Sequence, residues 1–307
     1  MLLAAVIVVV MVGAILLVWP NDETATVVAS EPRGRIAFVR PCDFCHLPAE
    51  IFSVEANGSD EAPLVQGAQP AWSPDGSRLA FVDPLGDGLR LANADGTGLR
   101  RLTSCRSPTC EVQMSPTWSP DGRRVAFVAQ YPAGDPVHSE LAVVTVGEGS
   151  VQTLLSCPRD GCRSIFHPAW SPDGGRISFW DFPYDGELLP TVRILQISTG
   201  QVRTLYECPR CGGVSGPSWS PDGDTMVIDA GRNLLLLDPS SGRLRRVTDC
   251  HVGDNCGYPA WSPDGGWIVF SKLIPEGGLE LVLVRPDGSG LRPLGIEGYL
   301  ASWRLLS

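Results

Sequence analysis

Short stretches in which hydrophobic and polar residues alternate run through the chain after residue 34, and five of them follow one repeated motif. The motif reads Pro-x-Trp-Ser-Pro-Asp-Gly and begins at residues 70, 116, 168, 217 and 259. It is followed by the stretches RLAFV, RVAFV, RISFW, TMVID and WIVFS. Alternation with period two is typical of half-buried strands, and Ser-Pro-Asp-Gly suits a type I turn because proline presets φ. Each copy therefore predicts a strand carrying the tryptophan, a tight turn and a second strand.

A second hairpin with glycine in its turn follows in each unit. These hairpins are LRLANADGTGLRRLT (89–103), LAVVTVGEGSVQTLL (141–155), VRILQISTGQVRTLY (192–206), LLLLDPSSGRLRRVT (234–248) and LELVLVRPDGSGLRPL (279–294). The tryptophans of the five motifs are 46, 52, 49 and 42 residues apart. Four short strands repeated at this period are typical of the blades of a β-propeller.

The two ends of the repeat region complete each other. A degenerate sixth copy, Ala301-Ser302-Trp303, lacks the turn and the second strand, whereas Arg35-Ile-Ala-Phe-Val39 matches a second strand. The sequence therefore predicts an all-β, six-bladed propeller over residues 34–307. In it the C-terminal strand is the innermost strand of the blade whose other three strands come from residues 35–66, which leaves no inner edge unpaired. We expect the six tryptophans to pack blade against blade.

The Pro-x-Trp-Ser-Pro-Asp-Gly block, followed by a hairpin such as the one that contains Asn93-Ala-Asp-Gly96, resembles the repeat of TolB and related six-bladed propellers. The resemblance covers residues 34–307 and implies a recognition scaffold. In TolB a separate α/β domain precedes the propeller; the printed sequence shows none, so the resemblance does not imply the Tol–Pal role. Similar propellers precede the hydrolase domain of prolyl-oligopeptidase-like enzymes, but no G-x-S-x-G elbow occurs in this sequence. We therefore expect no enzymatic activity.

The N-terminal segment predicts attachment to a membrane. Residues 2–19 carry no charge, and eighteen apolar residues in a helix span about 27 Å, enough for a bilayer core. We interpret residues 1–19 as a transmembrane anchor or signal segment. An uncleaved anchor is favoured because no basic residue precedes the apolar run, with Val27-Val28-Ala29 as the alternative cleavage site. Residues 20–33 are expected to form a polar tether.

Charge narrows the range of partners. The chain has 24 Lys and Arg against 34 Asp and Glu, a formal net charge of −10, whereas nucleic-acid binding needs a basic surface. With 43% hydrophobic and 19% charged residues the chain is too apolar for a disordered protein.

The ten cysteines form five closely spaced pairs, which we interpret as disulfides. The pairs are Cys42/Cys45, Cys105/Cys110, Cys157/Cys162, Cys208/Cys211 and Cys250/Cys256. Four are expected in blade-to-blade loops and the first between the second and third strands of the closing blade, all on one face. His46, His138, His167 and His251 are expected in loops of the same face. Because disulfides persist outside the cytosol, we place the propeller outside the cytoplasm, at the bacterial cell surface or in the periplasm.

Two cofactor alternatives stand beside the expectation that no cofactor is bound. Cys42-Asp-Phe-Cys45-His46 matches the C-x-x-C-H attachment pattern of c-type haem, which would make the protein an electron carrier. Zinc is the other alternative, because Cys-x-x-Cys pairs occur at 42/45 and 208/211 and histidines follow Cys45 and Cys250 directly.

Aromatic residues in the longest insertions between second and third strands suggest a binding surface. The insertions span residues 129–140 and 180–190 and carry Tyr131, Phe182 and Tyr184. Aromatic side chains on rigid loops commonly anchor interfaces. We therefore predict that Tyr131, Phe182 and Tyr184 bind an extracytoplasmic protein or surface polymer, with an enzyme that uses this loop face as a further alternative.

Overall fold

The computed structural model describes residues 31–40, 49–104, 112–131, 138–158, 162, 164–182, 189–208, 215–251, 255–275 and 277–305. The chain divides into two compact units, residues 1–30 and 31–307. The predicted anchor, the alternative cleavage site and most of the predicted tether belong to the first unit and lie outside the described residues. Within the described ranges, no helix has the length and hydrophobicity needed to cross a bilayer.

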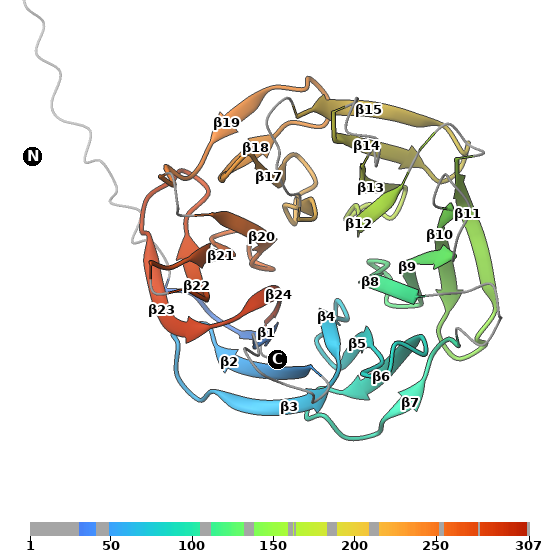
Figure 1. Ribbon diagram of the computed structural model, residues 1–307, viewed down its shortest axis with the longest axis horizontal. Helices are drawn as coiled ribbons and strands as arrows, with labels where there is room; N and C mark the ends of the chain where they lie inside the picture. The colour runs from blue at the N-terminus through green and yellow to red at the C-terminus, as the bar shows by residue number, and fades with distance from the viewer. Residues whose placement is uncertain are drawn as a thin grey trace, which may run out of the picture. The chain divides into compact units, whose positions relative to one another are not determined.

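The second unit is a ring of six four-stranded antiparallel sheets (Figure 1), as predicted. In each blade the strands are given from the centre outward. Blade 1 comprises β24 (Tyr299–Arg304), β1 (Arg35–Val39), β2 (Glu50–Glu55) and β3 (Ala62–Gln66); blade 2 comprises β4 (Ala68–Trp72), β5 (Arg78–Val82), β6 (Leu89–Asn93) and β7 (Arg100–Arg101). Blade 3 comprises β8 (Val112–Trp118), β9 (Arg124–Tyr131), β10 (His138–Thr145) and β11 (Val151–Cys157).

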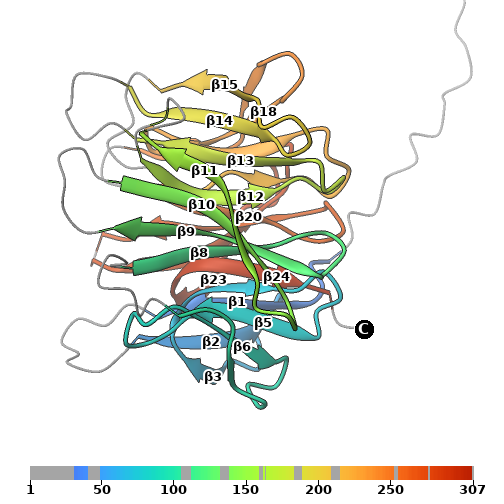
Figure 2. The same cartoon turned by 90° about the vertical axis from the view of Figure 1, so that its right-hand side faces the viewer.

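The other three blades repeat this order. Blade 4 comprises β12 (Ile165–Trp170), β13 (Arg176–Asp181), β14 (Thr191–Gln196) and β15 (Val202–Glu207); blade 5 comprises β16 (Ser218–Trp219), β17 (Met226–Ala230), β18 (Asn233–Leu237) and β19 (Leu244–Arg246). Blade 6 comprises β20 (Cys256–Trp261), β21 (Ile268–Leu273), β22 (Leu279–Val284) and β23 (Arg292–Glu297). Seen from the side, the strands run between two faces of the ring (Figure 2). We call the face with the Ser-Pro-Asp-Gly turns the turn face, and the opposite face the loop face.

Blade 1 closes the ring in the way the sequence predicts. β24 pairs antiparallel with β1, so the last strand of the chain joins its first. The indole of Trp303 donates a hydrogen bond of 2.8 Å to the carbonyl of Arg33, and Trp72 of blade 2 donates its backbone N–H to the Ser302 hydroxyl at 3.0 Å. The packed unit begins at residue 31 and so includes Arg33, the last residue of the predicted tether.

The five Ser-Pro-Asp-Gly turns share one hydrogen-bond pattern, which explains why this order of residues recurs. In the first copy the Ser73 hydroxyl donates to Asp75 at 2.5 Å, while the backbone N–H groups of Ser77 and Arg78 donate to Asp75 and Ser73. These donors favour the ionised carboxylate and lower the pKa of Asp75 to about 2. The turn therefore satisfies its polar groups internally and holds the first two strands of blades 2 to 6 in register.

The tryptophans of the first strands pack between blades, as predicted; all six are less than 10% exposed. In four blades an arginine guanidinium lies over the tryptophan ring. The pairs are Arg78 over Trp118 at 4.7 Å, Arg124 over Trp170 at 5.0 Å, Arg176 over Trp219 at 4.8 Å and Arg304 over Trp72 at 4.4 Å. The first three arginines open the second strand of the preceding blade, so each stack joins two neighbouring blades.

This series of arginine–tryptophan stacks, which we call the ladder, is interrupted at Trp261. The position that carries arginine in blades 2 to 4 is occupied by Thr225 in blade 5. We expect Arg124→Leu to lower the free energy of unfolding by about 1 kcal/mol, since it removes one partly buried cation–π contact. Thr225→Arg should raise it by about 0.5–1 kcal/mol by supplying the missing stack on Trp261. Urea unfolding measures both, with exposed Arg243→Leu as the control that should change little. A Thr225→Arg variant less stable than the wild type would contradict this account of the ladder.

Candidate binding site on the ring axis

The innermost strands share an irregularity that positions the candidate site. Five of the six pair out of register with the second strand of their blade near the middle of the strand, which marks a β-bulge. At each bulge one residue other than glycine lies in the left-handed region. These residues and their φ values are Gln69 (52°), Ser115 (53°), His167 (48°), Tyr258 (54°) and Leu300 (55°). Such backbone is unfavourable for these residue types by on the order of 1–3 kcal/mol each, so the fold must hold it in place.

The bulges surround a cavity of about 130 Å³. Because it is lined by residues from all six innermost strands or the segments that precede them, it lies on the axis of the ring, inside the circle of β4, β8, β12, β20 and β24 (Figure 1). Gly216 of blade 5 takes the sixth place, and the next residue in each blade, proline in five of them, completes the lining. The backbone is thus nearly constant around the cavity, whereas the side chains differ in every blade.

Gly216 is required by the close approach of its neighbour. A Cβ atom at this position would lie 2.7 Å from the Cβ of His167, which is closer than carbon atoms pack. The absence of a side chain lets the His167 ring come within 6.4 Å of the Tyr258 ring, centroid to centroid, although these residues belong to blades 4 and 6.

An aromatic arc includes two residues of the cavity lining, His167 and Tyr258. We use this name for Phe182, Phe166, His167, Tyr258 and Tyr299. Successive ring centroids along the arc are 6.3, 6.4, 6.4 and 5.8 Å apart, within or close to the spacing of interacting aromatic pairs. Burial lowers the pKa of His167 to about 4, and it raises the pKa of Tyr258 and of Tyr299. All five rings are therefore uncharged at neutral pH.

Two further residues of the cavity lining, Gln69 and Ser115, are polar. The carboxamide oxygen of Gln69 in blade 2 accepts a hydrogen bond from the backbone N–H of Ser115 in blade 3. The Ser115 hydroxyl in turn lies 3.4 Å from Nδ1 of His167 in blade 4. A chain of polar contacts thus links three blades and meets the aromatic arc at His167.

A buried carboxylate, Asp229, lies behind the residues that line the cavity. It ends the TMVID stretch at a position occupied by Val82, Val128 and Trp180 in blades 2 to 4. Its oxygens accept hydrogen bonds from the backbone N–H of Ser215 at 2.8 and 2.9 Å and from the Ser215 hydroxyl at 2.5 Å. Burial nevertheless dominates and raises the pKa of Asp229 to about 7.

Two of the three residues predicted to bind a partner lie among the described residues. Phe182 follows β13 on the loop face, and its ring meets Phe166 edge-on, so it forms the outer end of the aromatic arc. Tyr131 is the last residue of β9 and not a loop residue, because β9 and β10 are longer than expected. Its hydroxyl donates to Glu140 at 2.9 Å and its ring stacks on His138, so it packs within blade 3. Tyr184 lies outside the described residues.

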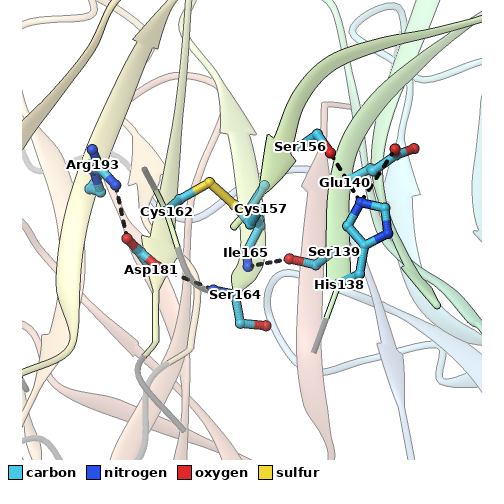
Figure 3. The surroundings of a disulfide bond; sticks show 10 residues. All are labelled: His138, Ser139, Glu140, Ser156, Cys157, Cys162, Ser164, Ile165, Asp181 and Arg193. Carbon is cyan, nitrogen blue, oxygen red and sulfur yellow. Dashed lines mark hydrogen bonds and ion pairs between the residues drawn. A yellow bond between two sulfur atoms is a disulfide. The ribbon is translucent and has the colours of Figure 1, made fainter. Parts of the chain in front are cut away.

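The histidine placement also differs from the prediction. His138 opens β10 and His167 lies within β12, so neither is a loop residue. Figure 3 shows Nε2 of His138 between the Ser156 hydroxyl, at 3.0 Å, and a carboxylate oxygen of Glu140, at 3.6 Å. A serine–histidine–acid relay needs hydroxyl and carboxylate on opposite ring nitrogens, whereas here both meet the same one.

The described cysteines bear out the predicted disulfides. Cys157 is bonded to Cys162 (Figure 3) and Cys250 to Cys256, Cys208 is also disulfide-bonded, and none of the cysteines in the described ranges is free. Both complete bridges tie the end of one blade to the start of the next, on the loop face, as expected: Cys162 precedes β12, and Cys256 opens β20. Each closes a loop of five or six residues, for which chain entropy gives roughly 2 kcal/mol.

Several cysteine predictions lie outside the described residues: those for Cys42, Cys45, His46, Cys105, Cys110 and Cys211. The haem alternative rests on the first three and stays a prediction. In the zinc alternative, Cys250 is bonded to Cys256 and is therefore not available as the thiolate that zinc binds.

Comparison with known proteins shows which solved structures have a similar fold. No family model and no curated protein matches the sequence. Among solved structures, TolB from Acinetobacter baumannii superposes with a TM-score of 0.71 and 18% identity, over 90% of this chain and 68% of that one. A chain of a nidogen/laminin complex gives a TM-score of 0.68 at 10% identity, over 89% and 99% of the two chains. A puromycin hydrolase gives 0.59 at 19% identity, over 85% of this chain and 45% of that one.

The chain therefore has the fold of a TolB-like six-bladed β-propeller, as its motifs indicated. At these identities the likeness establishes the fold alone, and the fold occurs both in binding proteins and in enzymes. Function has to be argued from the site.

Proposed function

We propose that this chain is a membrane-anchored extracytoplasmic propeller that binds a protein partner through its axial cavity and the loop face around it. The observation that carries the proposal is the set of five left-handed residues of different chemistry on a nearly constant backbone. Strained backbone that persists is characteristic of functional sites, and bulges re-aim side chains. Variation confined to the side chains around one cavity suits recognition.

The surroundings of the cavity support binding rather than catalysis. The aromatic arc offers the residue types that dominate interface energetics, and Phe182 extends it from the cavity toward the loop face. The disulfides Cys157–Cys162 and Cys250–Cys256 pin connections on that face, which keeps a binding surface in shape. The same disulfides favour an extracytoplasmic location, and residues 1–19 would supply the single-pass anchor.

Photo-cross-linking in intact cells tests the proposal. A diazirine amino acid of leucine size is placed at Leu300, which lines the cavity, at Phe182 on the loop face, or at Ser240 in the turn between β18 and β19 on the turn face. We expect the first two positions to capture the same protein and Ser240 to capture none. Capture from Ser240 alone, or equally from all three positions, would refute the proposed binding face.

A further inference from the structure

The axial cavity has a definite electrostatic character. Its lining contains no arginine, lysine, aspartate or glutamate from the described part of the chain. The rings of the aromatic arc are uncharged, and the face of an aromatic ring carries partial negative charge. An anion would therefore meet no positive side chain here, whereas a cation would meet two uncharged aromatic rings, those of His167 and Tyr258.

Asp229 adds a negative group directly behind the cavity wall. The Ser215 hydroxyl donates to Asp229 and also accepts the backbone N–H of Tyr258, so one serine joins the carboxylate to the cavity wall. A Cβ atom added to Gly257 would lie 3.3 Å from Oδ2 of Asp229. Among the described residues, no arginine or lysine forms an ion pair with Asp229, and its hydrogen bonds come from Ser215. The negative charge that it can carry is thus left without a counter-ion from the described part of the chain.

The size of the cavity limits its occupant. A volume of about 130 Å³ is close to the roughly 150 Å³ of an engineered cavity that holds one benzene molecule. An α-helix, about 10 Å wide with its side chains, is too large. One side-chain head group fits. The net charge of −10 also favours the approach of positive groups over long range.

We infer that the axial cavity binds one organic cation, the guanidinium or ammonium head group of an arginine or lysine side chain of the partner. The inference rests on the proposed function, because it names the group of the partner that enters the cavity. Tyr258 and His167 offer their ring faces to this cation, Gln69 and Ser115 offer oxygen acceptors across from them, and Asp229 supplies the compensating charge from behind Tyr258.

The test compares two ligands of nearly the same shape on the full-length protein in detergent. N-acetyl-arginine amide carries a guanidinium, and N-acetyl-citrulline amide replaces it with a neutral urea. Binding is followed by the NMR signals of the four histidine rings, with His167 as the reporter and His138 in blade 3 as the internal control. We expect the arginine compound to bind at least tenfold more tightly than the citrulline compound and to shift the His167 signals selectively.

Variants of Tyr258 test whether its aromatic ring is responsible for binding of the arginine compound. Tyr258→Leu should weaken binding of the arginine compound at least fivefold, whereas Tyr258→Phe, which keeps the ring, should stay within twofold of the wild type. Tyr206→Leu, in β15 and outside the cavity lining, is the matched control and should leave binding unchanged. Because the ligand comparison is made on the unaltered protein, it remains decisive even where a variant folds poorly.

Equal binding of the arginine and citrulline compounds at His167 would overturn the cation inference and leave the binding site itself intact. No binding of either compound would likewise overturn it, while the cross-linking experiment would still decide the proposed function independently. If the inference holds, the arginine compound should also reduce cross-linking from Leu300 at least severalfold.

Discussion

Ending the chain after Gly298 is expected to abolish cooperative folding of the ring. This truncation removes β24, the innermost strand of blade 1, and exposes the edge of β1 that now pairs with it. It also removes the buried ring of Trp303, which packs in one core cluster with Ile36 and Phe38. Loss of a buried tryptophan side chain alone costs about 3–5 kcal/mol, and whole domains are stable by only about 5–15 kcal/mol.

Two further variants distinguish the loss of ring closure from a general effect of shortening the chain. Trp303→Ala should lower the free energy of unfolding by about 3–5 kcal/mol while the backbone pairing persists. Ending the chain after Arg304 should have little effect, because this truncation preserves β24 and removes Leu305, which is 44% exposed. Thermal unfolding followed by circular dichroism compares the three with the full chain. A protein ending at Gly298 that melts within a few degrees of the full chain would show that β24 does not close the ring.

The architecture was predictable because its signals are local and repeated. Each Pro-x-Trp-Ser-Pro-Asp-Gly block encodes a strand and a turn within seven residues, and five copies fix the number of strands per unit. Even the mixed blade could be inferred, because Trp303 lacked a second strand that Arg35–Val39 supplied. The strand ends were less predictable: Tyr131 and His138 extend the β9–β10 hairpin through pairing of one with the other, a contact that residue types alone do not reveal.

The axial cavity was missed for a physical reason. Its residues occupy the position directly before the proline of each motif, where Gln69, Ser115, His167, Gly216 and Tyr258 share no property that marks a site. Of the non-glycine residues only His167 is of a type enriched in the left-handed region, so the bulges could not be inferred from composition. The one available signal was this variation itself, at a fixed place in a constant motif. Asp229 was visible as a carboxylate in an apolar stretch, but its partner Ser215 lies 14 residues earlier and only the fold joins them.

Asp229→Asn should stabilise the protein increasingly as the pH rises, because burial raises the pKa of the Asp229 carboxyl. In the unfolded chain the carboxyl has its ordinary pKa of 3.8, whereas in the folded protein its pKa is about 7. Below pH 4 it is protonated in both states. Between pH 4 and 7 the unfolded chain releases this proton first, so wild-type stability falls by up to about 4 kcal/mol over the interval. Asparagine does not titrate, and the variant is spared this loss.

Urea unfolding of both proteins at pH 4.5, 6, 7.5 and 8.5 measures the difference, in which groups distant from Asp229 cancel. Asp75→Asn is the control: because the pKa of Asp75 is lowered to about 2, its contribution to stability is lost only below pH 4, so the Asp75→Asn difference should stay constant from pH 4.5 to 8.5. An Asp229→Asn difference that is constant with pH, or that shrinks as the pH rises, would mean that the folded protein holds Asp229 ionised throughout. The Ser215 hydrogen bonds would then outweigh burial. A rising difference would instead show that the fold tolerates an uncompensated carboxylate beside its axial cavity, and a cation bound there would relieve that destabilisation.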